Sequence, residues 1–488
     1  MEEIMQNNAN TTQSSRSATS QLQSVRAAIQ KQRDYFSTGA TLSYDFRLRQ
    51  LKKLRELILA NESQIIEALT RDLGKSKTEI YNTEIDYVIA DLDFIAKNLK
   101  NWMSPQKFTA PFMLWPASSQ VNSEPYGVSL IISPWNYPFQ LMVSPLIGAI
   151  AAGNTAIIKP SEVTKNTEKL ILDFINKNFP PEYLYVMTGG PEKAQEILKE
   201  QFDFIFFTGG TEVGKVVMRA AAEHLTPVCL ELGGKSPCII DQDVNLSVTA
   251  KRVTWGKFMN VGQTCVAPDF LLVHESVKPQ LIAEIKKTIE EFYTSDPQKS
   301  ESLGRIVSER HFDRLVKMIE TAKTSDKQKI LHGGRSDRST RFIEPTLIEL
   351  SPGGETAECM KEEIFGPVWP LITYKSLDEA ILLIKKMTKP LALYVYTNNS
   401  DVSERVLKEL SFGGGCVNDC NVHLASPHLP FGGVGSSGIG AYHGKHSFDL
   451  FSHKKSILKK SFAMDSSLRY PPYSDKKLSI LRKLMKFS

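Results

Sequence analysis

The sequence contains few cysteines for its length and no apolar segment long enough to cross a membrane. Six cysteines are spread over 488 residues without the spacing of zinc ligands: Cys229, Cys238, Cys265, Cys359, Cys416 and Cys420. A chain of this size needs no disulfide framework, so we expect free thiols in a reducing compartment and no metal site. No run approaches the roughly 18 apolar residues of a membrane-spanning helix. These absences exclude a disulfide-rich scaffold, a zinc-finger protein and a membrane-spanning protein.

The amino terminus lacks the features of a targeting signal. Met1-Glu2-Glu3 begins acidic and is followed by an Asn-, Thr- and Ser-rich stretch that contains no apolar core. A secretory signal requires such a core. We therefore expect a disordered lead-in over residues 1–20 and a cytoplasmic protein.

A large charge excess is absent from most of the chain. The net charge of the chain is +5. The last 35 residues, from Lys454 onward, contain ten cations and two anions, Asp465 and Asp475, and so carry a net charge of +8. The rest of the chain therefore carries −3. A slightly negative net charge outside the tail argues against binding of nucleic acid by this part of the chain. With 41% hydrophobic and 23% charged residues, the composition is that of a globular protein. Its length predicts two or three domains.

Two kinds of periodicity divide the first half of the chain. Apolar residues at helical spacing predict helices over 21–102, whereas prolines punctuate Phe108–Tyr126 and predict an extended excursion, such as a hairpin that reaches a partner subunit. From Gly127 strands alternate with helices, which predicts a parallel sheet covered on both faces. The expected strands are Val128–Ile132, Ala156–Ile158, Leu184–Met187, Phe202–Phe207 and Val228–Leu232, and the expected helices are Phe139–Ala152, Thr164–Asn176, Pro191–Glu200 and Glu212–Glu223.

A second α/β region follows from about Ser236 to Gly440. Helices near Val277–Phe292 and Glu309–Thr324 and strands near Ile343–Leu350 and Ala392–Thr397 predict a separate sheet. Ligands of parallel sheets bind at the carboxyl ends of the strands. The unusual loops of the chain fall there.

The segment Thr226–Asp269 carries the strongest chemical signal. Glu231 ends a buried strand and precedes two glycines, and Cys265 lies in a polar loop, Asn260-Val261-Gly262-Gln263-Thr264-Cys265. A buried cysteine is more often an inert small hydrophobe. A thiol paired with a carboxylate, however, supplies the nucleophile and the base that a covalent catalyst needs.

Three further loops suggest a bound dinucleotide and an oxyanion donor. Thr208–Lys215 follows a strand and opens a helix, where backbone N–H groups favour a phosphate, although it is neither GxGxxG nor a P-loop. Lys159 and Glu162 suit the hydroxyls of a ribose. Asn136 stands between two prolines that hold its amide rigidly for donation to an oxyanion. The structural alternatives are a glycine-bearing turn, a surface ion pair and an Asx-turn.

Taken jointly, these motifs resemble the aldehyde dehydrogenase superfamily over nearly the whole chain, from about residue 30 to Pro472. The segments that carry the resemblance are Pro134–Pro138, Lys159–Glu162, Phe207–Gly214, Glu231–Pro237, Gly262–Cys265, Glu362–Pro367 and Leu429–Gly435. The stretch Pro430–Gly438, Tyr442–Lys445, Phe448, Phe451–His453 and Arg469–Pro472 are similar to the class 3 and fatty aldehyde dehydrogenase branch.

The resemblance implies an α/β fold with a Rossmann-type cofactor domain, a second α/β catalytic domain and a small β oligomerisation element. The implied boundaries are 21–106 with 127–233 for the cofactor domain, 234–440 for the catalytic domain, 107–126 with 441–462 for the oligomerisation element, and 463–488 for a basic tail. A homodimer is the implied assembly.

The resemblance also implies site residues and chemistry. Cys265 would add to the aldehyde carbonyl, Asn136 and the Cys265 N–H would hold the oxyanion of the thiohemiacetal, and Glu231 would activate the water that releases the acid from a thioester. NAD would be bound by a set of residues that comprises Trp135, Lys159, Glu162, Thr208, Gly209, Gly210, Gly214, Leu232, Glu363 and Phe365. Because Glu162 would repel a 2′-phosphate, NAD is favoured, although this branch often accepts NADP as well.

Tyr137, Trp255 and His423 are candidates for the wall of an apolar substrate tunnel. Packing aromatics beside an active loop and a structural histidine are the alternatives for these positions. The implied substrates are medium- to long-chain, aromatic or isoprenoid aldehydes.

The basic tail from Lys476 to Phe487 is amphipathic at helical spacing, with Leu478, Leu481 and Leu484 on one side and cations on the other. Such a helix is typical of contact with an anionic membrane surface. The alternative is a helix that covers the protein's own tunnel mouth.

Two other functions are compatible with the same scaffold. An acylating or semialdehyde-specific relative is one, and Glu231, a hydrolytic base, argues against the acylating enzyme. A non-catalytic binding protein is the other, and the presence of Cys265 and Asn136 argues against it.

Overall fold

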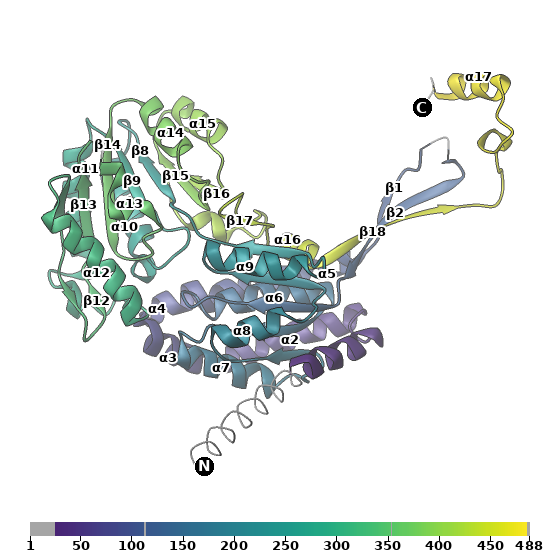
Figure 1. The fold of residues 1–488 in the computed structure, drawn as a ribbon, viewed down its shortest axis with the longest axis horizontal. Helices are drawn as coiled ribbons and strands as arrows, with labels where there is room; N and C mark the ends of the chain where they lie inside the picture. The colour runs from purple at the N-terminus through teal and green to yellow at the C-terminus, as the bar shows by residue number, and fades with distance from the viewer. Residues whose placement is uncertain (1–24, 112–113, 353, 486–488) are drawn as a thin grey trace, which may run out of the picture.

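The computed structural model describes residues 25–111, 114–352 and 354–485. They form a body that contains two sheets and an arm that projects from the body (Figure 1). The lead-in expected over 1–20 lies outside the described residues. Within the described part of the chain, no helix is both long and apolar enough to span a bilayer.

A six-stranded sheet forms the centre of the first part of the body. Its strand order is β17-β7-β6-β3-β4-β5, parallel except for β17. The strands are β3 (Val128–Ile132), β4 (Thr155–Lys159), β5 (Leu184–Val186), β6 (Phe204–Thr208), β7 (Val228–Glu231) and β17 (Gly438–Ile439). The short β17 comes from far along the chain and pairs Gly438 with Glu231, so a loop of the predicted catalytic domain completes this sheet.

Helices cover both faces of this sheet because its strands are apolar on both sides. In β6, for example, Ile205 and Phe207 belong to one core, and Phe204 and Phe206 belong to the other. Helical residues 25–37, α8 (Pro191–Leu198) and α9 (Thr211–Ala222) lie on the first face. The second face is covered by α6 (Gln140–Ala152) and α7 (Lys165–Asn176), with α2 (Tyr44–Ala60), α3 (Glu62–Leu73) and α5 (Asp86–Met103) packed behind them.

A seven-stranded sheet forms the centre of the second part of the body. Its order is β10-β13-β14-β9-β8-β15-β16, parallel except for β10. The strands are β8 (Pro237–Ile240), β9 (Phe270–His274), β10 (Gln328–His332), β13 (Thr346–Leu350), β14 (Val368–Tyr374), β15 (Ala392–Tyr396) and β16 (Gly414–Val417). The helices are α10 (Leu246–Phe258), α11 (Lys278–Tyr293), α12 (Glu309–Thr324), α13 (Glu358–Lys361), α14 (Leu377–Lys385) and α15 (Ser400–Glu409).

The α/β fold expected from the sequence is confirmed, and the predicted elements between 128 and 232 begin and end within two residues of the observed ones. One expected strand differs. Ile343–Leu350 is interrupted at Glu344-Pro345, so that β12 (Phe342–Ile343) pairs with β11 (Ser336–Asp337) while β13 joins the large sheet. Proline has no N–H to donate to a ladder, which explains the break.

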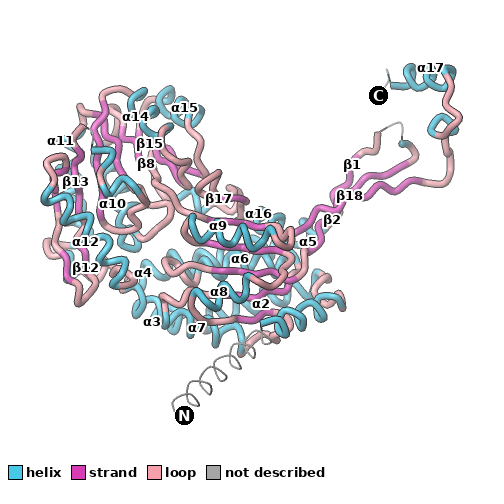
Figure 2. Tube along the Cα trace, viewed as in Figure 1, coloured by secondary structure: helices cyan, strands magenta, loops and turns pink. Residues whose placement is uncertain are grey.

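The arm is an antiparallel three-stranded sheet, β1-β2-β18 (Figure 2). Its strands are β1 (Gln106–Phe108), β2 (Ala117–Pro125) and β18 (Ser452–Lys460), and the last two pair along their full length. The excursion expected over Phe108–Tyr126 therefore folds with a strand from the end of the chain. Of the segment 441–462 that was expected in the oligomerisation element, only residues from Ser452 onward enter the arm. The preceding helix, α16 (Lys445–Leu450), packs against α6 in the body. A helix, α17 (Asp475–Leu484), lies at the outer end of the arm.

Candidate active site

Cys265 lies where two cavities meet. Together with Leu141, it lines a cavity of about 240 Å³ on the side of the six-stranded sheet and a second, apolar cavity of about 210 Å³. Asn136 and Glu231 line the first of these cavities. The structure therefore brings together the three residues that the sequence analysis nominated for catalysis.

The loop that carries Cys265 is held in an unusual backbone conformation. After α10, Asn260, Val261 and Gly262 have φ values of 50°, 56° and 75°. A Cβ at Gly262 would stand 2.4 Å from the carbonyl oxygen of Gly366, so only glycine fits there. Non-glycine residues with positive φ persist where their surroundings over-determine them. Here the Asn260 side chain supplies part of that restraint, because its Nδ2 donates to the carbonyl oxygens of Asn136 (2.8 Å) and Gln263 (3.1 Å).

The environment of the thiol disfavours its ionised form. Burial, followed by the nearby carboxylates of Glu363 and Glu231, raises the pKa of Cys265 well above its usual range. The nucleophilic form of a cysteine is the thiolate. A positive charge brought into the cavity would therefore activate this thiol.

Glu231 ends β7 and is 2% exposed. Its Oε1 accepts from the Cys229 Sγ at 3.7 Å, whereas its Oε2 has no hydrogen-bond partner among the described residues. Burial raises the pKa of this carboxyl well above the usual value for glutamate. A carboxylate with a raised pKa is a stronger base than an exposed one.

Asn136 is buried between Pro134 and Pro138 at the end of β3. One hydrogen of its Nδ2 is donated to the carbonyl oxygen of Gln263 at 3.1 Å, which fixes the amide. The amide has a second N–H, and Asn136 lines the same cavity as Cys265. That second hydrogen is available for an oxyanion.

Most of the expected cofactor residues line the first cavity. They are Trp135, Thr208, Gly209, Gly210, Leu232, Glu363 and Phe365. Lys159 and Glu162 lie outside this lining, at the end of the neighbouring strand β4, where the Lys159 Nζ donates to the Glu162 Oε2 at 2.8 Å. Gly214 also lies outside it, and a Cβ there would come within 2.6 Å of the Leu232 side chain.

The residues present fit a dinucleotide. The Thr208 Oγ1 is buried without a partner among the described residues, and a Cβ on Gly210 would meet no atom within 4 Å, so the amino terminus of α9 is open. A helix start of this kind attracts phosphate groups. The Glu363 carboxyl has its pKa raised well above the usual value by burial and by Asp269.

Leu141, His311 and Arg314 of the first cavity were missed by the sequence analysis. His311 packs on Trp135 with ring centroids 4.8 Å apart, and burial together with Arg314 and Arg310 lowers its pKa to about 4. Arg314 donates to the carbonyl oxygen of Ile364 and so supports the loop that contains Glu363. His311 and Arg314 lie on α12, and Leu141 lies on α6. The periodicity predicted both helices, but tertiary packing determines which of their residues reach the cavity.

The second cavity is apolar and aromatic. Of the three expected wall residues, Tyr137 and Trp255 line it. His423 departs from the expectation and does not line it, because its Nδ1 lies 3.5 Å from the Cys416 Sγ and its ring packs near Tyr394. The apolar and aromatic wall residues that the sequence analysis missed are Tyr87, Leu141, Met259, Val266, Val422, Leu424, Ala425, Phe431 and Tyr442. The polar ones are Asn82, Thr83, Gln140, Thr264, Asn421 and His443.

These wall residues come from separate parts of the chain. Tyr87 lies in α5, Met259 begins the turn Met259–Gly262, and Val422–Ala425 forms a 3₁₀ turn. Phe431 and Tyr442 form an isolated bridge, and their rings are 5.7 Å apart. Phe431 and Tyr442 lie in segments that carry the family resemblance, but no local pattern assigns any of these residues to a cavity wall, because the fold alone makes them neighbours.

Comparison with known proteins agrees with this geometry. Residues 3–457 match the aldehyde dehydrogenase family. The chain is 50% identical over 442 residues to the 4,4′-diaponeurosporen-aldehyde dehydrogenase of Staphylococcus aureus, covering 91% of this chain and 95% of that one. It is 45% identical over 454 residues to the dimeric NADP-preferring aldehyde dehydrogenase of Rattus norvegicus, covering 92% and 98%. The solved substrate-bound structure of a Staphylococcus aureus AldH matches with a TM-score of 0.91 and 47% identity, covering 94% and 99%.

The fold and the site thus define an NAD(P)-dependent aldehyde dehydrogenase. The chain belongs to the aldehyde dehydrogenase family. Relatives named as family 3 members, such as that of Macaca fascicularis with 45% identity over 453 residues and 92% coverage of each chain, confirm the resemblance to the class 3 branch.

Proposed function

We propose that this enzyme oxidises extended apolar aldehydes, of medium or long chain, aromatic or isoprenoid, to carboxylic acids through a covalent adduct on Cys265. The position of Cys265 carries this proposal. Its thiol faces a cavity that suits a dinucleotide on one side and an apolar aromatic cavity on the other. A thiol between these two compartments can bond to a carbonyl carbon without exposing the adduct to bulk water.

The contacts of each residue support the catalytic roles that we propose. Cys265 attacks the carbonyl carbon, and the negative charge that develops on oxygen is held by the Asn136 Nδ2 and by the backbone N–H of Cys265. NAD(P), when bound, supplies the acceptor for the hydride. Glu231, with a raised pKa and an unpartnered Oε2, takes a proton from the water that hydrolyses the resulting thioester.

The dinucleotide would be held by residues of five loops. The helix start at Gly209 and Gly210 would hold the pyrophosphate, Lys159 and Glu162 would hold the adenosine ribose, and Glu363 would hold the nicotinamide ribose. The dinucleotide would be surrounded by Trp135, Thr208, Leu232 and Phe365. Gly214 would allow α9 to approach closely. Glu162 would accept a hydrogen bond from a ribose 2′-hydroxyl and repel a 2′-phosphate, which favours NAD while NADP is also accepted. The rat relative is named as NADP-preferring.

The wall of the second cavity indicates the substrate class. Its described lining residues include no Lys, Arg, Asp or Glu, and burial lowers the pKa of His443 to about 3, so that this histidine is neutral. A semialdehyde that carries a carboxylate would find no cationic partner there. The relative in Staphylococcus aureus is named for an isoprenoid aldehyde, which agrees with an apolar wall.

Chain length provides a test of this substrate class. In a panel of linear aldehydes assayed by cofactor absorbance with NAD and with NADP, kcat/KM should rise about fourfold per methylene until the cavity is filled, because burial of each methylene contributes about 0.8 kcal/mol. The Leu424→Asn variant should flatten this dependence, and Leu424→Met should retain it. A panel in which short or carboxylate-bearing aldehydes are preferred would reject the proposed class.

We propose that the enzyme is a homodimer whose arm contributes to the contact. The arm projects from the body (Figure 1), and β18 is an edge strand of its sheet within the described residues. Unpaired strand edges favour pairing with another chain. The rat relative is named as dimeric.

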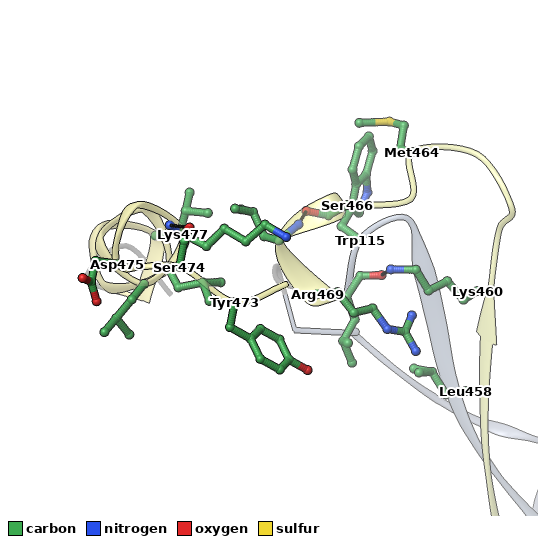
Figure 3. A pocket seen from close by; sticks show the side chains of 15 residues that line it. Trp115, Leu458, Lys460, Met464, Ser466, Arg469, Tyr473, Ser474, Asp475 and Lys477 are labelled. Carbon is green, nitrogen blue, oxygen red and sulfur yellow. Dashed lines mark hydrogen bonds between the residues drawn. The ribbon is translucent and has the colours of Figure 1, made fainter. Parts of the chain in front are cut away.

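We propose that the tail makes peripheral contact with the cytoplasmic surface of a membrane. The apolar side chains of Trp115, Met464, Leu478 and Leu481 line a groove between α17 and the arm, with Lys460, Arg469 and Lys477 around it (Figure 3). Phe462 and Tyr473 are 105% and 75% exposed. Apolar groups beside cations suit an anionic bilayer surface. The alternative of a helix over this chain's own tunnel mouth does not fit, since α17 lies at the outer end of the arm (Figure 1).

Removal of 476–488 should abolish co-sedimentation with vesicles that contain anionic lipid, because it removes the basic helix. Replacement of Lys476, Lys477, Arg482 and Lys483 by glutamine serves as a matched control for charge, and it should weaken binding about as strongly at physiological salt, since each cation contributes about 1 kcal/mol near such a surface. Unchanged binding of the truncated chain would disprove the membrane contact.

A further inference from the structure

A lysine and a glutamate that the mechanism does not use form a fully buried ion pair beneath the catalytic loops. The Lys75 Nζ donates to the Glu84 Oε1 at 2.8 Å, and both side chains are 0% exposed. Two charges removed from water in this way are costly unless further hydrogen bonds satisfy them. Both groups do have such partners, and these partners belong to the loop that contains Asn136.

Glu84 binds the end of that loop. Its Oε2 accepts from the backbone N–H groups of Phe139 (3.2 Å) and Gln140 (2.9 Å), where the loop becomes helix α6. Unpaired N–H groups at the start of a helix favour a carboxylate. The carboxylate thereby fixes the direction in which the loop leaves the active site.

Lys75 binds the middle of the same loop. Its Nζ donates to the carbonyl oxygen of Asn136 at 3.3 Å and lies 3.8 Å from the centroid of the Tyr137 ring, in a cation–π contact. The same carbonyl oxygen accepts from the Asn260 Nδ2 at 2.8 Å. The peptide group of Asn136 is therefore restrained by a lysine from one side and by the loop of Cys265 from the other.

The segment between Lys75 and Glu84, which is helical from Lys77 onward, also contacts the cysteine loop. Glu79, in α4 (Lys77–Ile80), accepts at its Oε1 from the backbone N–H of Asn260 at 2.7 Å. Glu84 lies in a π-helical turn, Tyr81–Ile85, of a kind often found at functional sites. One segment thus touches the backbone of both loops that present catalytic groups.

We propose that Lys75 and Glu84 are positioning residues for the oxyanion site. The pair holds the Asn136 backbone so that the side-chain amide, already fixed by Gln263, keeps its second hydrogen directed at the carbonyl oxygen of the substrate. Neither side chain lines the two cavities that meet at Cys265, so the effect is transmitted through the residues of the Asn136 loop that the pair contacts. This inference rests on the proposed role of Asn136.

A double-mutant cycle between Lys75→Met and Asn136→Ala tests the inference by single-turnover formation of reduced cofactor. Asn136→Ala should lower the rate constant by about 10²- to 10³-fold, as loss of an oxyanion donor does. Lys75→Met should lower it about 10- to 100-fold in the wild-type background, the scale of a misplaced catalytic group, and less than about threefold in the Asn136→Ala background. KM for the aldehyde should change little.

Arg47→Met is the matched control. Arg47 is another buried cation, and it donates to the carbonyl oxygens of Thr41 (3.0 Å) and Ala151 (3.2 Å) at the opposite end of α6. Its replacement should lower the melting temperature without coupling to Asn136. If Lys75→Met does not fold, Lys75→Met/Glu84→Gln removes both charges together and avoids a lone buried charge.

An equal loss of rate in both backgrounds, or no loss in the wild-type background, would overturn the positioning role. Full activity of Asn136→Ala would instead reject the proposed oxyanion donor, so the two failures are distinguishable.

Discussion

Replacement of Cys265 by serine is expected to lower kcat by at least about 10⁴-fold, because the proposed reaction proceeds through a sulfur adduct. A serine hydroxyl has a far higher pKa than a thiol, and the surroundings of residue 265 already disfavour an anion: burial, Glu363 and Glu231 raise the pKa of the thiol. Among the described residues no histidine hydrogen-bonds to residue 265 to replace the missing activation: the ring nitrogens of His443 lie 3.0 Å from the Tyr87 hydroxyl, and the His311 ring packs on Trp135. The measurement is steady-state formation of reduced cofactor with a saturating medium-chain aldehyde.

Cys416→Ser is the control for this experiment. Cys416 is half-buried, as is Cys265, but its Sγ lies 3.5 Å from the His423 Nδ1, away from both cavities. We expect kcat to change less than about twofold in this variant. If Cys265→Ser retained a tenth of wild-type activity while remaining folded, the sulfur would not be the nucleophile and the proposed mechanism would fail.

Local motifs were sufficient to nominate the three proposed catalytic residues, because each follows or ends a strand or helix whose end is visible in the sequence. Glu231 ends the apolar run of β7, Asn136 follows β3 between two prolines, and Cys265 stands in a loop rich in glycine and amides. In a parallel sheet the carboxyl ends of neighbouring strands meet at one edge, so the loops were expected to converge.

Apart from Tyr137 and Trp255, the walls of the apolar cavity were not predictable by the same reasoning. Tyr87 and Leu424 stand at ordinary positions, and Tyr442 lies in a motif that does not indicate a wall role. Tertiary packing alone brings these residues to the cavity that Cys265 lines. His423 shows the converse limitation: it stands between two wall residues in sequence, yet the tight turn Val422–Ala425 directs its ring toward Cys416.

The buried pair beneath the Asn136 loop was hidden for a related reason. Lys75 and Glu84 lie in a region for which the sequence predicts helices with charged residues on their surface. Lysine and glutamate side chains are normally exposed to solvent. Burial of both becomes evident only when the loop that supplies their other hydrogen bonds is in place. Sequence periodicity does not contain that information.

Replacement of Glu231 by glutamine should separate the two halves of the reaction. The variant retains Cys265 and Asn136, so we expect a first turnover that yields about one equivalent of reduced cofactor per active site. Release of the acid should then be about 10²- to 10⁴-fold slower than in the wild type, the usual contribution of a general base. The acyl group should remain on Cys265 as a mass increase of the intact chain, and a small external nucleophile such as hydroxylamine should discharge it. Absence of the initial burst would show that Glu231 acts before the thioester forms.

The same substitution should change the dependence of stability on pH in a defined direction. Burial raises the folded-state pKa of Glu231 above the value of about 4.3 that a glutamate has in an unfolded chain. The folded enzyme therefore binds this proton more tightly, and wild-type stability falls as pH rises from the unfolded pKa to the folded pKa. Glutamine does not titrate, so the melting temperature of Glu231→Gln relative to wild type should increase between pH 5 and pH 8. A difference that stays constant, or shrinks, over this range would show that the carboxyl is not destabilised by burial, and Glu231 would then lack the elevated basicity on which its proposed role in hydrolysis depends.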